Sequence, residues 1–199
     1  DSAQGRFAAV GDELQVANGT KLNYEQQSSY SVTVRAVDYF GVSLEKAFRI
    51  DILDVNEPPT ARAGGPYAVR AGTSITLDGS GSDPEQSSGT LVYEWDLDDD
   101  GVFGEIGDTS ARGDEMGTQP VLRAVGLVGP TTYPISLRVT DQGGLTNVAT
   151  VNVRIDENKP PVAVAGGPYS VRETLSTTLD GSGSSDTERP ADTLIYEWD

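Results

Sequence analysis

The chain has 199 residues and carries 31 acidic against 14 basic side chains, a formal net charge of −17, with neither cysteine nor histidine. This charge repels phosphate backbones and anionic lipid, which argues against a protein that binds nucleic acid or a membrane surface. The missing residue types exclude disulfide scaffolds, thiolate or imidazole metal sites and Ser-His-Asp catalysis. Hydrophobic residues make up 36% of the chain, enough for a buried core. The acidic excess favours cations, calcium above all.

Apolar residues that alternate with a period of two predict β-strands along the chain. They occur at residues 30–37, 48–53, 91–95, 133–139 and 151–155. Turn residues separate these runs, at Asn18-Gly19, Asp78-Gly79, Gly81 and Gly143-Gly144. Short strands with turns at this spacing predict an all-β fold of tandem antiparallel β-sandwiches.

Residues 58–82 recur as residues 160–184, with 18 of 25 positions identical. Both copies begin with Pro-Pro, which stiffens a joint between domains. The repeat predicts three parts: residues 1–57, a full unit at 58–157, and the N-terminal part of a second unit at 158–199. Because the chain begins with Asp1 and the second unit stops after its Trp198 strand, we expect a piece of a longer protein.

The first 57 residues resemble the C-terminal half of a cadherin repeat. The resemblance rests on LNYE at 22–25, SYSVTVRAVD at 29–38 and DVNEPP at 54–59, in that order. In cadherins these motifs hold calcium between consecutive domains. The resemblance implies calcium ligands at Asn23, Glu25, Asp38, Asp54, the carbonyl of Val55, Asn56 and Glu57. Asn23 and Glu57 replace aspartates of the cadherin motifs, so we expect fewer or weaker ions, and Asp38 would serve a preceding junction.

Residues 58–157, and the partial unit after them, resemble PKD domains, which are Ig-like β-sandwiches. The matching stretches are AGGPY at 63–67, LDGSGSDPE at 77–85, YEWD at 93–96 and LRVTDQGG at 137–144. PKD domains are usually non-catalytic spacers and interaction modules of secreted or surface proteins, and some bacterial examples bind calcium near the N-terminal joint. The resemblance implies ligands at Asn56 or Glu57, Asp83, Glu85 and Asp141. For the second unit it implies Glu157 or Asn158, Asp186 and Glu188.

A second candidate calcium loop follows the YEWD stretch. Asp96, Asp98, Asp100 and Gly101 have the spacing of the first half of an EF-hand-type loop. The twelfth position is Gly107 instead of the usual bidentate glutamate, and Glu105 or Asp108 could substitute. For this loop and for the joint, the alternative interpretation is a solvated acidic turn.

Two other interpretations of these residues are weaker. Trp95 and Trp198, with Tyr93 and Tyr196, could form a platform for sugars, but a tryptophan on a central strand of an Ig-like sandwich normally packs in the core. The carboxylates of a glycosidase need a substrate cleft, which nothing in the sequence implies. We therefore expect no enzyme.

Together these features predict a non-catalytic, calcium-binding, extracellular adhesion and spacer module of a large bacterial-type surface or secreted protein. Its partners would be other surface proteins, in homophilic or heterophilic contact, or extracellular polysaccharide, and any membrane anchor would lie outside these residues. The alternative is an ancillary module that binds or displays polysaccharide for a secreted hydrolase.

Overall fold

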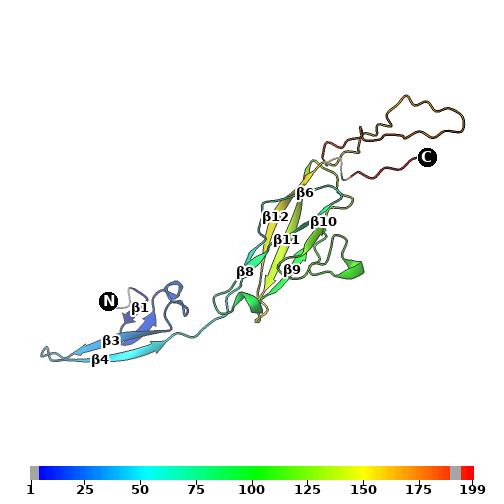
Figure 1. The fold of residues 1–199 in the computed structure, drawn as a ribbon. Helices are drawn as coiled ribbons and strands as arrows, with labels where there is room; N and C mark the ends of the chain where they lie inside the picture. Colours follow the sequence, from blue (N-terminus) through cyan, green and yellow to red (C-terminus); the bar gives the residue numbers. More distant parts are fainter. Residues whose placement is uncertain (1–4, 189–193) are drawn as a thin grey trace. The chain divides into compact units, whose positions relative to one another are not determined.

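The computed structural model describes residues 5–188 and 194–199, and its regular structure is almost entirely β-strand (Figure 1). Helical structure in this part of the chain is confined to three single 3₁₀ turns, η1 (Gly19–Lys21), η2 (Ser88–Thr90) and η3 (Gly107–Thr109). None of the described helices is long and apolar enough to cross a membrane. The all-β prediction is confirmed.

The chain divides into two compact units, each built from three separate stretches of the sequence. The first unit runs to Thr60 and includes Gly81–Val92 and Val139–Asn147. The second comprises Ala61–Ser80, Tyr93–Arg138 and Val148–Asp199. The proposed boundaries at 57 and 157 stay predictions, and residues 189–193 of the second repeat lie outside the described residues.

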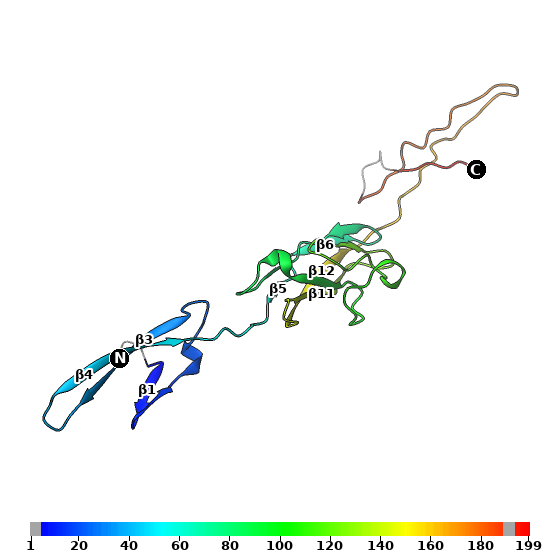
Figure 2. The same ribbon diagram turned by 90° about the horizontal axis from the view of Figure 1, so that it is seen from below.

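Two antiparallel hairpins begin the first unit (Figures 1 and 2). β1 (Phe7–Val10) pairs with β2 (Glu13–Val16), and β3 (Ser29–Val37) pairs with β4 (Ser43–Asp51). Phe7 and Tyr30 form the centre of a small core, with ring centroids 5.8 Å apart in an edge-to-face arrangement. Val34 on β3 is 46% exposed, so only the start of the predicted alternating face is buried.

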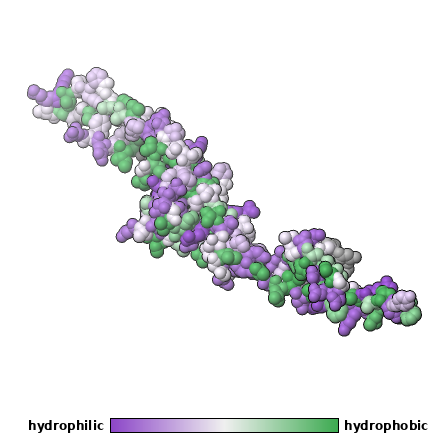
Figure 3. Space-filling view, turned by 180° about the vertical axis from the view of Figure 1, so that it is seen from behind, coloured by the Kyte–Doolittle hydropathy of each residue, from purple (hydrophilic) through white to green (hydrophobic). Residues whose placement is uncertain are grey.

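Apolar side chains also reach the surface, where they lie between polar ones (Figure 3). In the β3–β4 turn, Tyr39 is 97% exposed and Phe40 is 86% exposed.

The remaining strands build the sandwich. They are β5 (Thr60–Arg62), β6 (Tyr67–Arg70), β7 (Ser74–Thr76), β8 (Ser80–Ser82), β9 (Val92–Asp96), β10 (Val121–Arg123), β11 (Thr131–Thr140) and β12 (Thr146–Asp156). A four-stranded sheet has the order β6-β12-β11-β9, while β10 pairs with β7 and β5 with β8. β12 runs parallel to β6, in contrast to the antiparallel pairing of β10 and β7. The prediction of a turn at Gly81 was wrong, because this residue lies inside β8.

Trp95 lies at the centre of the sandwich core and is fully buried. Its indole Nε1 donates a hydrogen bond to the carbonyl of Gly117 at 2.9 Å. Gly79 is needed beside it, because a Cβ there would lie 2.5 Å from Trp95 Cζ2 and 2.8 Å from Leu137 Cδ2. The other fully buried apolar side chains include Leu77, Leu97, Leu122, Ile135, Val139, Val153 and Ile155. The prediction that Trp95 is a core residue is confirmed.

The described part of the second repeat keeps some local geometry of the first. The hydroxyl of Tyr169 accepts a hydrogen bond from the backbone N–H of Asp180 at 2.7 Å, just as that of Tyr67 accepts one from Asp78 at 2.8 Å. Its pairing within the described residues is an isolated β-bridge, with no assigned strand.

Candidate metal centres

Four carboxylates meet in the first unit and are called the first acidic cluster. They belong to Glu25, Asp54, Glu57 and Glu85, and one oxygen of each lies within 4.8 Å of the others. Glu25 sits in the turn before β3, Asp54 and Glu57 follow β4, and Glu85 follows β8. A cavity of about 350 Å³ beside the cluster is also lined by Tyr24 and Pro84. Three segments that are distant in sequence therefore deliver acidic side chains to one place.

Several oxygens at the first acidic cluster are shielded from solvent and, with every carboxyl ionised, have no hydrogen-bond donor among the described residues. These are Glu57 Oε2, Asp83 Oδ2 and both carboxylate oxygens of Glu85. The other oxygen of Asp83 accepts the backbone N–H groups of Glu85 and Gln86 at 3.0 Å each, which fixes this loop. Shielded carboxylate oxygens without donors are costly, and a cation would compensate them.

The crowding also changes the proton affinity of Glu85. A hydrogen bond with the Glu57 carboxyl, together with lost solvation and the nearby Asp83, raises the pKa of Glu85 to about 7. A proton shared between two carboxyls therefore offsets part of their repulsion at neutral pH when no metal is bound. A divalent ion would displace that proton.

Asn56 and Asp141 hold the linker beside the cluster. Asn56 Nδ2 donates to Asp141 Oδ2 at 2.7 Å, and the backbone N–H of Leu145 donates to Asp141 Oδ1 at 2.8 Å. Gly143 allows this approach, because a Cβ there would lie 2.7 Å from Asn56 Nδ2. Asp141 is nearly buried, with 5% of its surface exposed. Both residues, predicted as calcium ligands, have hydrogen bonds here that position the linker.

Three other predicted ligands are not members of the grouped carboxylates: Asp38, the amide of Asn23 and the carbonyl of Val55. Asn23 Oδ1 accepts the backbone N–H of Gln26 at 2.7 Å. Asp38 Oδ1 accepts two backbone N–H groups of the β3–β4 turn, at 2.9 and 2.8 Å. The side chain of Val55 is exposed in the linker. Their assignment as ligands stays a prediction.

A second acidic cluster lies in the second unit. Its members are Asp96, Asp98, Asp100, Glu105 and Glu115. One oxygen from each of the three aspartates lies within 4.8 Å of the others, and Asp98 joins the two glutamates in the same way. Asp98 is common to both groups, so the five carboxylates form one connected site.

The loop that carries this cluster is closed by hydrogen bonds to its own carboxylates. Asp96 is 5% exposed and accepts the backbone N–H groups of Asp100 at 3.2 Å and Gly101 at 3.0 Å. Glu115 is fully buried and accepts those of Leu97 at 2.7 Å and Glu105 at 3.2 Å. These four hydrogen bonds fix the shape of the loop.

Burial dominates the titration of the two glutamates. It raises the pKa of Glu115 to about 7, against the opposing effect of the two backbone N–H donors. Burial, followed by repulsion from the three aspartates, raises the pKa of Glu105. Asp98 Oδ1 and Glu105 Oε2 are shielded from solvent and have no donor in the described chain. The second acidic cluster therefore shares two features with the first, a glutamate whose pKa is raised and shielded carboxylate oxygens without donors among the described residues.

The structure places Glu105 near the predicted EF-hand-type loop, while Asp108 lies in η3 outside both groups. Glu115 was missed. It lies beyond a twelve-residue loop and comes close because the backbone N–H of Trp95 donates to its carbonyl at 2.7 Å. The spacing of residues within a motif cannot predict a ligand that a backbone hydrogen bond brings in from another segment of the chain.

The second repeat preserves one part of the first cluster's framework. Asp186 Oδ1 accepts the backbone N–H of Glu188 at 2.8 Å, as Asp83 does for Glu85. Glu188 Oε2 is shielded and has no donor within the described residues. The grouped carboxylates in this part of the chain do not include these two residues, so their role as ligands stays a prediction.

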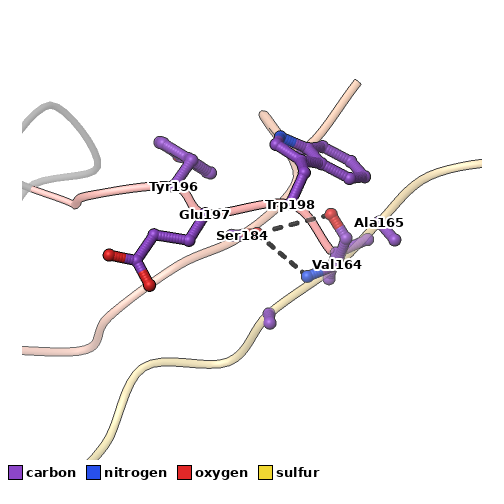
Figure 4. A pocket seen from close by; sticks show the side chains of 8 residues that line it. Val164, Ala165, Ser184, Tyr196, Glu197 and Trp198 are labelled. Carbon is purple, nitrogen blue, oxygen red and sulfur yellow. Dashed lines mark hydrogen bonds between the residues drawn. The ribbon is translucent and has the colours of Figure 1, made fainter. Parts of the chain in front are cut away.

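The aromatic residues of the two repeats differ in exposure. Trp95 is fully buried and Tyr93 is 8% exposed, so they cannot form a platform for sugars. Their counterparts Trp198 and Tyr196 are 51% and 45% exposed. They line an open cavity of about 140 Å³ together with Val164, Ala165, Ser184 and Glu197 (Figure 4).

No protein-family model matches the chain. It is 33% identical over 172 residues to the dyslexia-associated protein KIAA0319-like protein of Mus musculus, which covers 83% of this chain and 15% of that protein. A solved structure of protocadherin gamma B2 extracellular cadherin domains 3–6 matches 81% of this chain and 39% of its own, with 17% identity and a TM-score of 0.49. The PKD1 domain of Vibrio anguillarum Epp matches 52% of this chain and 99% of its own, with 22% identity and a TM-score of 0.36.

The solved structures that the chain is similar to thus include cadherin ectodomains and a PKD domain, the two families that its sequence motifs resemble. The cadherin-like segment supplies Glu25, Asp54 and Glu57 to the first acidic cluster, and the PKD-like repeat supplies Glu85. The second acidic cluster lies wholly in the PKD-like repeat. The chain spans about 15% of the length of the KIAA0319-like relative. The bacterial-type origin expected from the sequence stays a prediction.

Proposed function

We propose that the chain is a non-catalytic, calcium-binding module of a cell-surface or secreted protein, which spaces and stiffens that protein for adhesion. The observation that carries the proposal is the first acidic cluster, where carboxylates from three segments converge and the shielded oxygens of Glu57 and Glu85 lack a donor among the described residues. A cation is the simplest compensation for such a group.

The donor set favours calcium over other metals. All the available side-chain donors are oxygens, and calcium takes six to eight oxygens at about 2.3–2.6 Å in flexible geometry. Magnesium demands near-ideal octahedral geometry, which side chains from three separate loop segments are poorly suited to provide. Zinc and copper prefer imidazole nitrogen and thiolate sulfur, and this chain has neither histidine nor cysteine.

An ion in the first acidic cluster would tie the turn before β3, the linker after β4 and the loop after β8 together. The linker is already held by the bond from Asn56 to Asp141 and begins its next segment with Pro58 and Pro59. Calcium would add an attractive centre where four carboxylates now repel one another. The linker would then flex less, as a spacer function requires.

We propose a second calcium ion in the second acidic cluster. Asp96, Asp98 and Asp100 would supply the first half of an EF-hand-type set, and Glu105 and Glu115 would replace its missing last ligand. The shielded Asp98 Oδ1 and Glu105 Oε2, which lack donors in the described chain, support this assignment. This ion would stabilise the loop of the PKD-like repeat.

The proposed partners are other surface proteins, in homophilic or heterophilic contact, and the proposed location is extracellular. Extracellular polysaccharide is a second candidate partner. The exposure of Tyr196 and Trp198 favours polysaccharide as a partner. Their counterparts in the first repeat, however, are core residues, which favours a packing role for Tyr196 and Trp198 as well. Binding of soluble polysaccharides that is lost on replacing Trp198→Ala would support this second candidate.

Terbium luminescence tests both ion sites. Terbium occupies calcium sites, and an aromatic ring next to the ion sensitises its emission. We expect emission excited through Tyr24 at the first cluster and through Trp95 at the second. Replacing Glu57→Gln together with Glu85→Gln should abolish the first signal, and Glu115→Gln should weaken the second. Glu45→Gln, an exposed position paired with Arg35 at 3.8 Å, is the matched control.

Excess calcium should quench both signals, and magnesium at the same concentration should not. Emission that is equal in all variants would contradict specific sites and would indicate diffuse attraction to a chain of net charge −17.

Stiffening needs a separate measurement. Because the chain has no cysteine, Val42→Cys and Val128→Cys, at positions 69% and 79% exposed, would give a clean spin-label pair. Calcium should narrow the distribution of distances between the two spin labels, measured by double electron–electron resonance, and a chelator should broaden it. An unchanged distribution would show that calcium, if bound, does not stiffen the chain.

A further inference from the structure

The exposed turn after β2 carries the sequence Asn18-Gly19-Thr20, which has the N-x-[ST] form of an acceptor for N-linked glycans. None of the other five asparagines is followed by serine or threonine two residues later. The two acidic clusters are formed by other residues, Glu25, Asp54, Glu57 and Glu85 in the first and acidic residues between 96 and 115 in the second.

The local geometry joins the two side chains that such a motif requires. Asn18 Oδ1 accepts the hydroxyl of Thr20 at 2.6 Å and the backbone N–H of Thr20 at 3.1 Å. Both bonds span only two residues, so the same turn can form before the domain has folded, when glycans are added. The bonds engage the oxygen of the amide, and the nitrogen Nδ2 is the atom that carries a glycan.

The surroundings leave room for a large substituent. Gly19 and Thr20 are exposed, and a Cβ on Gly19 would meet no atom within 4 Å. Asn18 itself is half-buried and begins the single turn η1 in extended conformation. The motif thus sits on a surface turn and does not lie inside a strand.

We propose that Asn18 is N-glycosylated when the chain passes through a secretory pathway, which rests on the proposed extracellular location. In the step, Asn18 Nδ2 attacks the anomeric carbon of a polyprenyl-diphosphate oligosaccharide. The carbon–nitrogen bond forms, the bond from that carbon to the diphosphate oxygen breaks, and Nδ2 loses one proton. A membrane oligosaccharyltransferase supplies the catalysis and the host supplies the donor.

A glycan at this position would protect a vulnerable edge. β1 and β2 form a two-stranded sheet, so among the described residues each has one edge without a strand beside it. Val10 and Val16 on these strands are each 55% exposed. Unpaired apolar edges invite pairing between chains, and a bulky hydrophilic group beside them hinders it.

The test is cell-free translation of the full chain, behind a cleavable secretion leader, with eukaryotic microsomes. Leader cleavage reports import whether or not the chain folds. We expect a slower electrophoretic mobility that treatment with peptide N-glycosidase reverses. Because this enzyme converts the glycosylated asparagine to aspartate, treatment in ¹⁸O-labelled water should place the heavy oxygen at residue 18. Asn18→Gln and Thr20→Ala should abolish the shift, while Thr20→Ser and Gly19→Ala should keep it.

An imported wild-type chain without the shift, or a shift that persists in Asn18→Gln, would overturn the proposal. Terbium emission of Asn18→Gln should equal that of the wild type, so failure of glycosylation leaves the calcium proposal standing. If the glycan protects the edge, enzymatic deglycosylation of the secreted chain should increase self-association in sedimentation velocity, and unchanged sedimentation would refute that role.

Discussion

Replacing Glu57→Gln should change stability in opposite directions with and without calcium. Without calcium, the substitution removes one of four carboxylates that lie within 4.8 Å of one another and gives Glu85 an amide donor. The variant should therefore unfold at a higher temperature than the wild type in the presence of a chelator. With calcium, the variant lacks one ligand and should gain less stability than the wild type.

The size of the calcium effect follows from mass action. An ion that binds only the folded state, at a hundredfold excess over its dissociation constant, stabilises it by about 2.7 kcal/mol. For a chain of this length that corresponds to about 5–11 °C in melting temperature. A tenfold loss of affinity in Glu57→Gln would leave about 1.4 kcal/mol, roughly half of the gain.

Differential scanning calorimetry with calcium, with magnesium and with chelator gives the comparison. Glu45→Gln, which makes the same change of charge outside both clusters, should show the full calcium gain of the wild type. The reasoning would be refuted if Glu57→Gln and Glu45→Gln responded identically to calcium, or if magnesium stabilised the wild type as much as calcium.

Three further predictions concern pH, packing and local order. Because Glu85 and Glu115 have pKa values of about 7 against an ordinary 4.5, the calcium-free folded chain binds more protons than the unfolded chain between these values. Their contribution to the free energy of unfolding is thus complete below pH 4.5 and is lost as the pH rises through about 7. In urea unfolding, the wild type should therefore lose stability with rising pH more steeply than the double variant Glu85→Gln/Glu115→Gln. Parallel curves of stability against pH would contradict this. Gly79→Ala should lower the free energy of unfolding by about 1–3 kcal/mol, because the Cβ of the alanine would overlap the ring of Trp95. An unchanged midpoint of urea unfolding would count against that packing. Amide hydrogens of residues 160–188 should exchange much faster than those of β11 and β12 in mass spectrometry, and slow exchange throughout the second repeat would show that it is ordered by itself.

Much of the fold was predictable because strand periodicity is a local property. The alternation in residues 133–139 and 151–155 corresponds to buried side chains on β11 and β12, and Trp95 is a core residue as expected. The role of Gly79 was not predictable, because it depends on an indole ring brought next to it by folding. Gly81 was mistaken for a turn residue, since a glycine-rich sequence does not reveal that β5 pairs with it.

The candidate sites show the same limit. The acidic motifs indicated Glu25, Asp54, Glu57 and Glu85 from two separate resemblances, and the structure brings their carboxylates together. Glu115 carries no motif of its own, and only the backbone pairing near Trp95 places it in the second cluster. Asn23 Oδ1 and Asp38 Oδ1 accept backbone N–H groups of local turns, and their assignment as ligands stays a prediction. The sequence thus identifies which side chains are acidic, but it does not tell which of them come together in the folded chain.

Isothermal titration of the metal-free chain with calcium tests the central claim most directly. We expect saturable binding with a dissociation constant at or below the roughly 10⁻⁴–10⁻³ M of extracellular calcium modules. Proton release near neutral pH should accompany it, because calcium displaces the proton held by Glu85. Replacing Glu57→Gln and Glu85→Gln together should remove this site and its proton release, while Glu45→Gln should leave both unchanged. Absence of saturable calcium binding at millimolar concentrations, or full binding by the double variant, would contradict the proposed calcium site.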